Sequence, residues 1–136
     1  MMDRTTDFFG GMIYAYSRAQ AIEDGELVDV SDIAKRSGFK IPVAVTRAVW
    51  DQYIEWTDTD NDRQTIQDKS GRLCDVLWML YLACKRNKEE SYINYELHVI
   101  PRDGSSKSPT LVKLKSVICG GDEGEPVITI MLPNED

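Results

Sequence analysis

The chain has 136 residues, 42% of them hydrophobic, which is enough for one domain with an ordinary apolar core. Its net charge of −7 argues against general nucleic-acid binding, because such binding depends on neutralising phosphates with lysine and arginine. The sequence shows no signal peptide, and no apolar run reaches the roughly 20 residues that span a bilayer, so a cytoplasmic protein is predicted.

The first 30 residues predict a short helix and a short strand. Residues 1–10 are interpreted as a loose N-terminal arm. Ser17 followed three residues later by Gln20 is the pattern of a capping box, which starts a helix by satisfying its first backbone N–H groups. This helix should end before Gly25, and the alternation at residues 27–30 predicts a short strand.

Two further helices are predicted on either side of an extended segment. Ser31 is expected to cap a helix over residues 32–37. A proline within residues 41–45 disfavours the helical conformation of the residue before it, so this segment should be extended. Thr46 is then expected to cap a third helix, which runs to about residue 56.

The segment after the third helix is predicted to be irregular. Residues 57–62 should form a polar, acidic loop, and residues 64–67 a brief strand. Residues 68–71 are expected to make a turn that leads into the next helix.

The longest periodic stretch covers residues 73–85. Its apolar side chains recur three and four positions apart, which is the spacing of one helix face. Trp78, Met79 and Leu82 extend the apolar surface to the flanks of that face. We therefore expect a core helix that is covered on more than one side.

After the central helix the hydrophobic period changes from about 3.6 to about 2 residues, which is typical of strands. Residues 92–99, 111–118 and 126–132 are predicted to form a three-stranded antiparallel meander, with a turn at residues 120–124. Helices thus come first and strands last. The predicted fold is a single α+β domain over residues 1–136, with short N-terminal helices and one central buried helix packed on that sheet.

Five blocks in order carry a family resemblance: SRAQAIEDGELVDVS, SGFKIPVAVTRAVWDQ, QDKSGRLCDVLWM, IPRDG and GDEGEPVITIMLPNED. They resemble a family of uncharacterised bacterial proteins that are frequent on plasmids, phages and other mobile elements. The resemblance covers the chain from about residue 8 to residue 136. It implies no catalytic residues, because the family is a domain of unknown function. The position of Cys74 is more often tryptophan in that family, so no role is assigned to it.

No pattern of residues indicates an enzyme, a cofactor or a metal site. His98 is the single histidine, and no cysteine or second histidine lies near it in the sequence. The stretch that begins at Asp58 opens like a calcium loop but lacks the glycine and glutamate that such a loop needs. The cysteines have no metal-ligand spacing and are interpreted as small buried side chains: Cys74, Cys84 and Cys119.

Residues 32–39 resemble the first helix and turn of a helix-turn-helix DNA reader. The second half of that motif does not follow, because Arg47 stands where a buried residue is needed. The alternative function is nevertheless a DNA-binding or plasmid-maintenance regulator. Its contact residues would be Lys35, Arg36, Lys40 and Arg47.

Two acidic stretches carry the main functional hypothesis. Residues 51–68 contain six acidic residues against one arginine, and residues 120–136 contain five acidic residues and no basic one. On one shared face, they would offer spaced negative charge to a basic, nucleic-acid-binding host protein. We predict a non-enzymatic accessory protein of a mobile genetic element that acts by binding another protein, and counter-defence (anti-restriction or anti-CRISPR) is one role that such an acidic face would suit. The predicted contact residues are Asp58, Asp60, Asp62, Asp122, Glu123 and Glu125.

Overall fold

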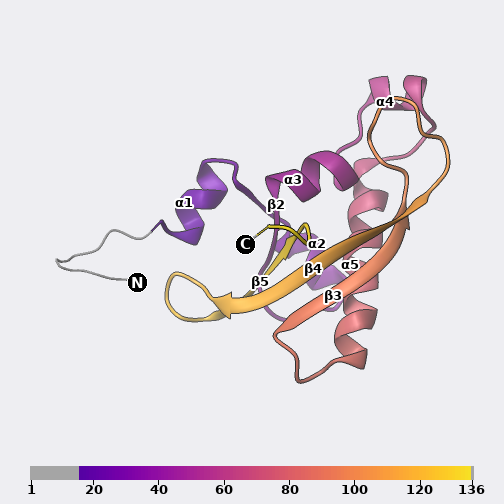
Figure 1. The fold of residues 1–136 in the computed structure, drawn as a ribbon. Helices are drawn as coiled ribbons and strands as arrows, with labels where there is room; N and C mark the ends of the chain where they lie inside the picture. Colours follow the sequence, from indigo (N-terminus) through magenta and orange to yellow (C-terminus); the bar gives the residue numbers. More distant parts are fainter. Residues whose placement is uncertain (1–15, 136) are drawn as a thin grey trace.

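The structure is a computed structural model that describes residues 16–135 as a five-stranded sheet with one long helix packed on it (Figure 1). In chain order the strands are β1 (Leu27–Asp29), β2 (Val43–Thr46), β3 (Tyr92–Val99), β4 (Thr110–Gly120) and β5 (Pro126–Met131). They lie side by side in the order β1-β2-β5-β4-β3. β2 runs parallel to β5, and the other neighbours are antiparallel. The loose arm predicted at residues 1–10 lies outside the described residues.

Most of the helices are short. They are α1 (Arg18–Glu23), α2 (Ser31–Arg36), α3 (Arg47–Val49), α4 (Asp58–Arg63) and α5 (Lys69–Arg86), and a π-helical turn, η1 (Trp50–Ile54), follows α3 directly. Within residues 16–135, no helix has the length and apolar character needed to cross a membrane.

The predicted α+β class is confirmed, but the three-stranded antiparallel sheet is wrong. The three predicted strands do form the antiparallel neighbours β3, β4 and β5. β2 extends this sheet by pairing in parallel with β5, with Val43 beside Ile128 and Val45 beside Ile130. Val43 and Val45 are fully buried, so burial of apolar surface drives a pairing between segments that are far apart in the sequence.

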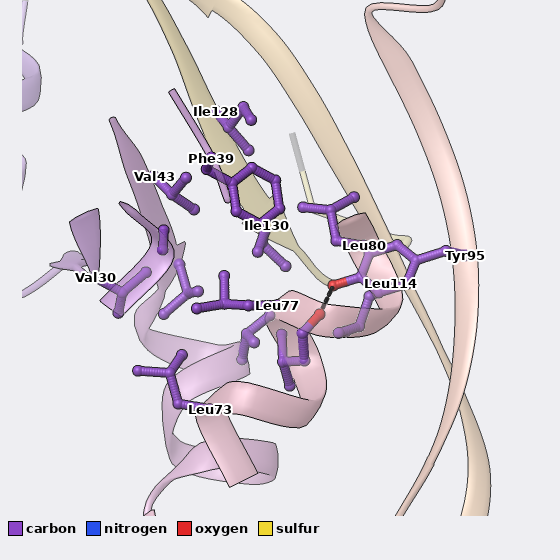
Figure 2. Close-up of a cluster of buried hydrophobic side chains, with 14 of the residues drawn as sticks. Val30, Phe39, Val43, Leu73, Leu77, Leu80, Tyr95, Leu114, Ile128 and Ile130 are labelled. Carbon is purple, nitrogen blue, oxygen red and sulfur yellow. Dashed lines mark hydrogen bonds between the residues drawn. The ribbon is translucent and has the colours of Figure 1, made fainter. Parts of the chain in front are cut away.

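The core lies between α5 and the inner face of the sheet (Figure 2). Leu77 and Leu80 of α5 have no exposed surface and lie against Leu114 and Ile130 of the sheet. Tyr95 is also buried, and its hydroxyl donates a 3.2 Å hydrogen bond to the backbone oxygen of Val76 in α5. Burial raises the pKa of Tyr95, so it stays a neutral donor.

The central helix is longer and less completely covered than predicted. Asp68 caps it by accepting a 2.6 Å hydrogen bond from the backbone N–H of Gly71, so the predicted turn at residues 68–71 is the first helical turn. Trp78 remains 52% exposed and stacks on Tyr81, with their ring centroids 5.7 Å apart. The expectation that Trp78 would be covered is therefore wrong for the part of the chain described.

The third predicted helix starts where expected and then widens. The Thr46 hydroxyl accepts a hydrogen bond from the N–H of Val49, which confirms the predicted cap. In η1 the hydrogen bonds join residues five apart, as in the 2.8 Å bond from the Glu55 N–H to the Trp50 oxygen. A π-helical turn brings positions five apart toward one face. This explains how Val49 and Ile54 are both fully buried.

Two local predictions between η1 and α5 are wrong. The predicted loop at residues 57–62 is mostly the helix α4, started by a capping box between Thr57 and Asp60. The predicted strand at residues 64–67 is irregular chain. The missed signal was the threonine followed three positions later by a carboxylate, which was interpreted only as acidic character.

The predicted cap of α2 also differs. Ser31 is the first residue of that helix, and its hydroxyl donates to the Asp29 carboxylate at 2.6 Å. The same hydroxyl accepts a 3.1 Å hydrogen bond from the Val43 N–H. Ser31 therefore joins α2 to β2 and does not cap a helix.

Candidate functional site

The two groups of predicted acidic contact residues lie at opposite ends of the molecule. Asp58, Asp60 and Asp62 are in α4, which packs beside the loop that leads into β4. Asp122, Glu123 and Glu125 are in the turn at the other end of β4 (Figure 1). β4 has 11 residues, and at about 3.3 Å per residue it separates the groups by roughly 35 Å. The structure does not bring them onto one face.

Asp60 is a structural residue. Its side chain is nearly covered, and its carboxylate accepts hydrogen bonds from the Thr57 N–H and from the Arg102 guanidinium, both at 2.8 Å. Burial by itself would raise the pKa of Asp60. The hydrogen bonds from Arg102 and Thr57 outweigh this effect and lower the pKa below its usual value. Asp60 is therefore ionised inside the fold and is not free to contact a partner.

The lowered pKa of Asp60 makes stability depend on acid pH. The carboxylate contributes stability above its unfolded-state pKa, and this contribution is lost as the pH falls through the lower pKa of the folded state. We expect Asp60→Asn to reduce the stability at neutral pH and to flatten its decline below about pH 4. Urea unfolding of both proteins across that range measures this. A decline of unchanged slope in Asp60→Asn would show that Asp60 does not carry the effect.

A buried polar network next to Asp60 holds the loop between β3 and β4. Arg72 is 3% exposed, and its guanidinium donates to the backbone oxygens of Ile54 at 3.1 Å and Ile100 at 2.8 Å. Gln64 is buried too, and its amide donates to the backbone oxygens of Pro101 and Ser106. Desolvation lowers the pKa of Arg72 to about 10, so it remains charged at neutral pH.

The contacts of this network fix the position of the loop between β3 and β4. Side chains contribute to it as well: Arg72 donates to the Gln67 side chain at 2.8 Å, and the Gln64 amide donates to the Asp103 carboxylate at 3.4 Å. The network could not be predicted from the sequence, because its partners come from four separate segments of the chain. The visible signal was a charged residue, Arg72, one position before the apolar face of the central helix.

The acidic turn between β4 and β5 is instead joined to α1. The Asp122 carboxylate accepts hydrogen bonds from the backbone N–H groups of Arg18 at 2.7 Å and Ala19 at 3.0 Å. These two bonds lower the pKa of Asp122. The Arg18 guanidinium points to the sheet, where it donates to Thr129 and to the backbone oxygen of Ile128, both at 2.8 Å.

This contact gathers acidic residues that the sequence keeps apart. α1 has six residues and is about 9 Å long, so its acidic C-terminal end stays near the turn. Figure 1 shows α1 and the turn at the same end of the molecule. In residues 16–29 and 119–135 the sequence has a single basic residue, Arg18. The exposed carboxylates, which we name the α1–turn surface, are Glu23, Asp24, Glu26, Asp122, Glu123 and Glu125.

The four basic residues of the DNA-binding alternative are divided. Lys35 and Lys40 line one open cavity of about 600 Å³ beside Phe39. Arg36 lines a different cavity, together with the acidic residues of β1 and α2. Arg47 lies 3.6 Å from the Asp51 carboxylate. The segment after α2 is the strand β2, so the second helix of a helix-turn-helix motif does not follow.

The described part of the chain contains no group of three or more His, Cys, Asp or Glu side chains that could hold a metal ion. Cys74 and Cys119 are exposed, which corrects their interpretation as buried residues, and Cys84 is partly buried. Cys74 points outward because it lies on the face of α5 opposite the core. Cys119 alternates with the core residue Ile118 and lines an open cavity on the outer face of the sheet, beside Val117 and Thr129.

Comparison with known proteins gives a family and no activity. The model of a family described as a family of unknown function (DUF6573) matches residues 5–136. No curated protein and no solved structure matches the chain.

Proposed function

For this chain, which belongs to the DUF6573 family of unknown function, we propose the role of a non-enzymatic accessory protein that binds another protein through the α1–turn surface. One observation supports this role: the two hydrogen bonds from α1 to Asp122, which bring two acidic segments together. The six carboxylates are exposed. Arg18, the one cation in these two segments, donates to the sheet. A cation from another segment, Arg47, lies nearby, and its guanidinium donates to the backbone oxygen of Gly25 at 2.9 Å.

The chemistry of this surface favours a basic partner. Several negative charges on a small surface attract a positively charged protein and speed the encounter. A basic, nucleic-acid-binding host protein fits, because its groove already accepts a row of phosphates. We propose that the protein acts in the cytoplasm for a mobile element, where occupation of such a groove would protect the element from restriction or CRISPR machinery.

The alternative role as a DNA-binding regulator has less support. Of its four basic residues, only Lys35 and Lys40 share a surface. A duplex-binding protein needs several cations on one face, and its affinity falls steeply with salt. A gel-shift assay at moderate salt separates the two roles: a shift that Lys35→Ala and Lys40→Ala remove would favour the regulator.

Charge reversal on the α1–turn surface tests the main proposal. We expect the triple variant Glu23→Lys, Glu26→Lys and Glu123→Lys to lose the partners that the wild type retains in an affinity pull-down from host lysate. These three side chains make no hydrogen bond within the described structure, so the fold should survive, whereas Asp122 must be kept because it positions α1. Wild-type binding should also weaken sharply as salt is raised.

A matched variant controls for net charge. Asp58→Lys, Asp62→Lys and Glu89→Lys reverse the same number of exposed carboxylates elsewhere. This variant should retain the partners. Equal loss from both variants would mean that only total charge matters, and equal retention would exclude the α1–turn surface.

A further inference from the structure

β3 is the last strand of the sheet, and its outer edge has no neighbour among the described residues (Figure 1). The Ile118 N–H donates to the Ser91 oxygen at 2.8 Å, which makes these two residues a hydrogen-bonded pair of the β3–β4 ladder. Such pairs alternate along an antiparallel ladder. The residues whose N–H and C=O groups point to the open edge are therefore Tyr92, Asn94, Glu96 and His98.

This edge lacks the usual protection against pairing. Natural edge strands are kept short or carry lysine, proline or a bulge. β3 has eight residues in unbroken register with β4, without proline or lysine, and Glu96 is its one acidic residue. The chain offers a long and regular template for another strand.

Exposed apolar side chains surround the same edge. Five large hydrophobic side chains are exposed in the described structure, and three of them lie here: Trp78, Tyr92 and Leu111, each at least 50% exposed. An open cavity of about 440 Å³ lies between Trp78 and Met79 of α5 and the end of β3 at His98. An added strand would cover apolar surface as well as backbone groups.

We propose that the occupant of this edge is a second copy of the chain, whose β3 pairs antiparallel with the first across a twofold axis at Tyr95. In this register Tyr92 faces His98 of the second copy, and Asn94 faces Glu96 of the second copy. All four residues with free edge groups then form hydrogen-bonded pairs, and the same contacts occur twice.

The side chains select this register over its neighbours. A shift of the axis to Glu96 places the two Glu96 carboxylates directly opposite each other, which is destabilising. A shift to Asn94 leaves His98 without a partner strand. With the axis at Tyr95, an amide faces a carboxylate and an aromatic ring faces an imidazole, so no like charges meet.

The pairing would make one continuous sheet from both copies. It is independent of the proposed role of the α1–turn surface, which lies elsewhere on the molecule. β3 is at the edge of the sheet farthest from β1, the strand that follows α1. Pairing would leave both α1–turn surfaces open, and a dimer would bind a repetitive partner more tightly than one copy does.

Sedimentation velocity of the full chain at about 1 to 200 µM tests the proposal, because dimerisation depends on concentration. We expect the wild type to form a dimer. Its dissociation constant should rise about tenfold in Asn94→Glu, because this variant places two pairs of glutamates opposite each other across the interface. It should fall severalfold in Asn94→Lys, which places a lysine opposite each Glu96. Within one chain Asn94 faces Lys115, so Asn94→Glu gains an internal charge partner and should remain folded.

The charge-reversed triple variant of the α1–turn surface is the control, and it should dimerise like the wild type. Glu96→Pro, which removes one edge N–H, should abolish the dimer, with circular dichroism checking that it is folded. A wild type that stays monomeric at about 200 µM overturns the proposal, whether or not the edge then binds an extended segment of a different protein. A dimer that Asn94→Glu and Asn94→Lys shift in the same direction, or not at all, overturns it as well.

Discussion

Replacing Leu80 with alanine is expected to lower the free energy of unfolding by about 2–5 kcal/mol. Leu80 has no exposed surface and lies in the core between α5 and the sheet (Figure 2). The loss has two parts: the apolar surface that is no longer removed from water, and the cavity left because the rigid sheet cannot close around a smaller side chain. Leu77→Ala should cost a similar amount, since Leu77 is equally buried one turn earlier.

Urea unfolding followed by circular dichroism measures both changes. Ile66→Ala is the matched control, because this aliphatic side chain is 85% exposed and its truncation should change stability by less than about 0.5 kcal/mol. Losses under about 1 kcal/mol at both leucines would contradict the assignment of α5 as the centre of the core.

Replacing Arg72 with methionine is expected to cost about 3–5 kcal/mol, although methionine fills a similar volume. The guanidinium satisfies the backbone oxygens of Ile54 and Ile100, which would lose their donor in a buried region. It also lies over the Trp56 ring, 4.4 Å from the centroid, and this contact would lose its charge. Arg72 thus connects η1, α5 and the end of β3.

Two variants make this prediction specific. Arg72→Lys should lose most of the same stability, because an ammonium group cannot supply the fork of N–H donors that reaches separate carbonyls. Arg86→Met, at the exposed end of the same helix, should change stability by no more than about 0.5 kcal/mol. A stable Arg72→Met protein would show that water can replace the guanidinium.

Only part of the α1–turn surface could be predicted from the sequence. The acidic residues of the β4–β5 turn were predicted as contact residues from the sequence, and their neighbours in space were not. The proposed α1–turn surface adds Glu23, Asp24 and Glu26, to which the sequence alone assigns no contact role. They lie near the β4–β5 turn because Asp122 binds the start of α1, a contact between residues more than 100 positions apart.

Most of the local structure could be predicted from short stretches of the sequence. The Ser17 cap and the stop at Gly25 are confirmed, since α1 begins after Ser17 and Gly25 has the positive φ of 82° that glycine tolerates best. The alternation of β3 is confirmed residue by residue in its burial. These features depend on residues that are adjacent in the sequence, so a short stretch of sequence is enough to predict them.

The pairing of β2 with β5, the burial of Asp60 and the exposure of Trp78 could not be predicted in this way. Each depends on a distant segment. β2 pairs with Ile128 and Ile130 of β5, and Asp60 is bound by Arg102. Trp78 is exposed because it lies beside β3, the last strand, beyond which the described structure has no further strand to cover it. A carboxylate in an acidic stretch looks solvated in the sequence, and a tryptophan on a core helix looks covered. Burial is a property of the whole packed chain, because the free energy of a charge or a ring depends on which groups replace its water.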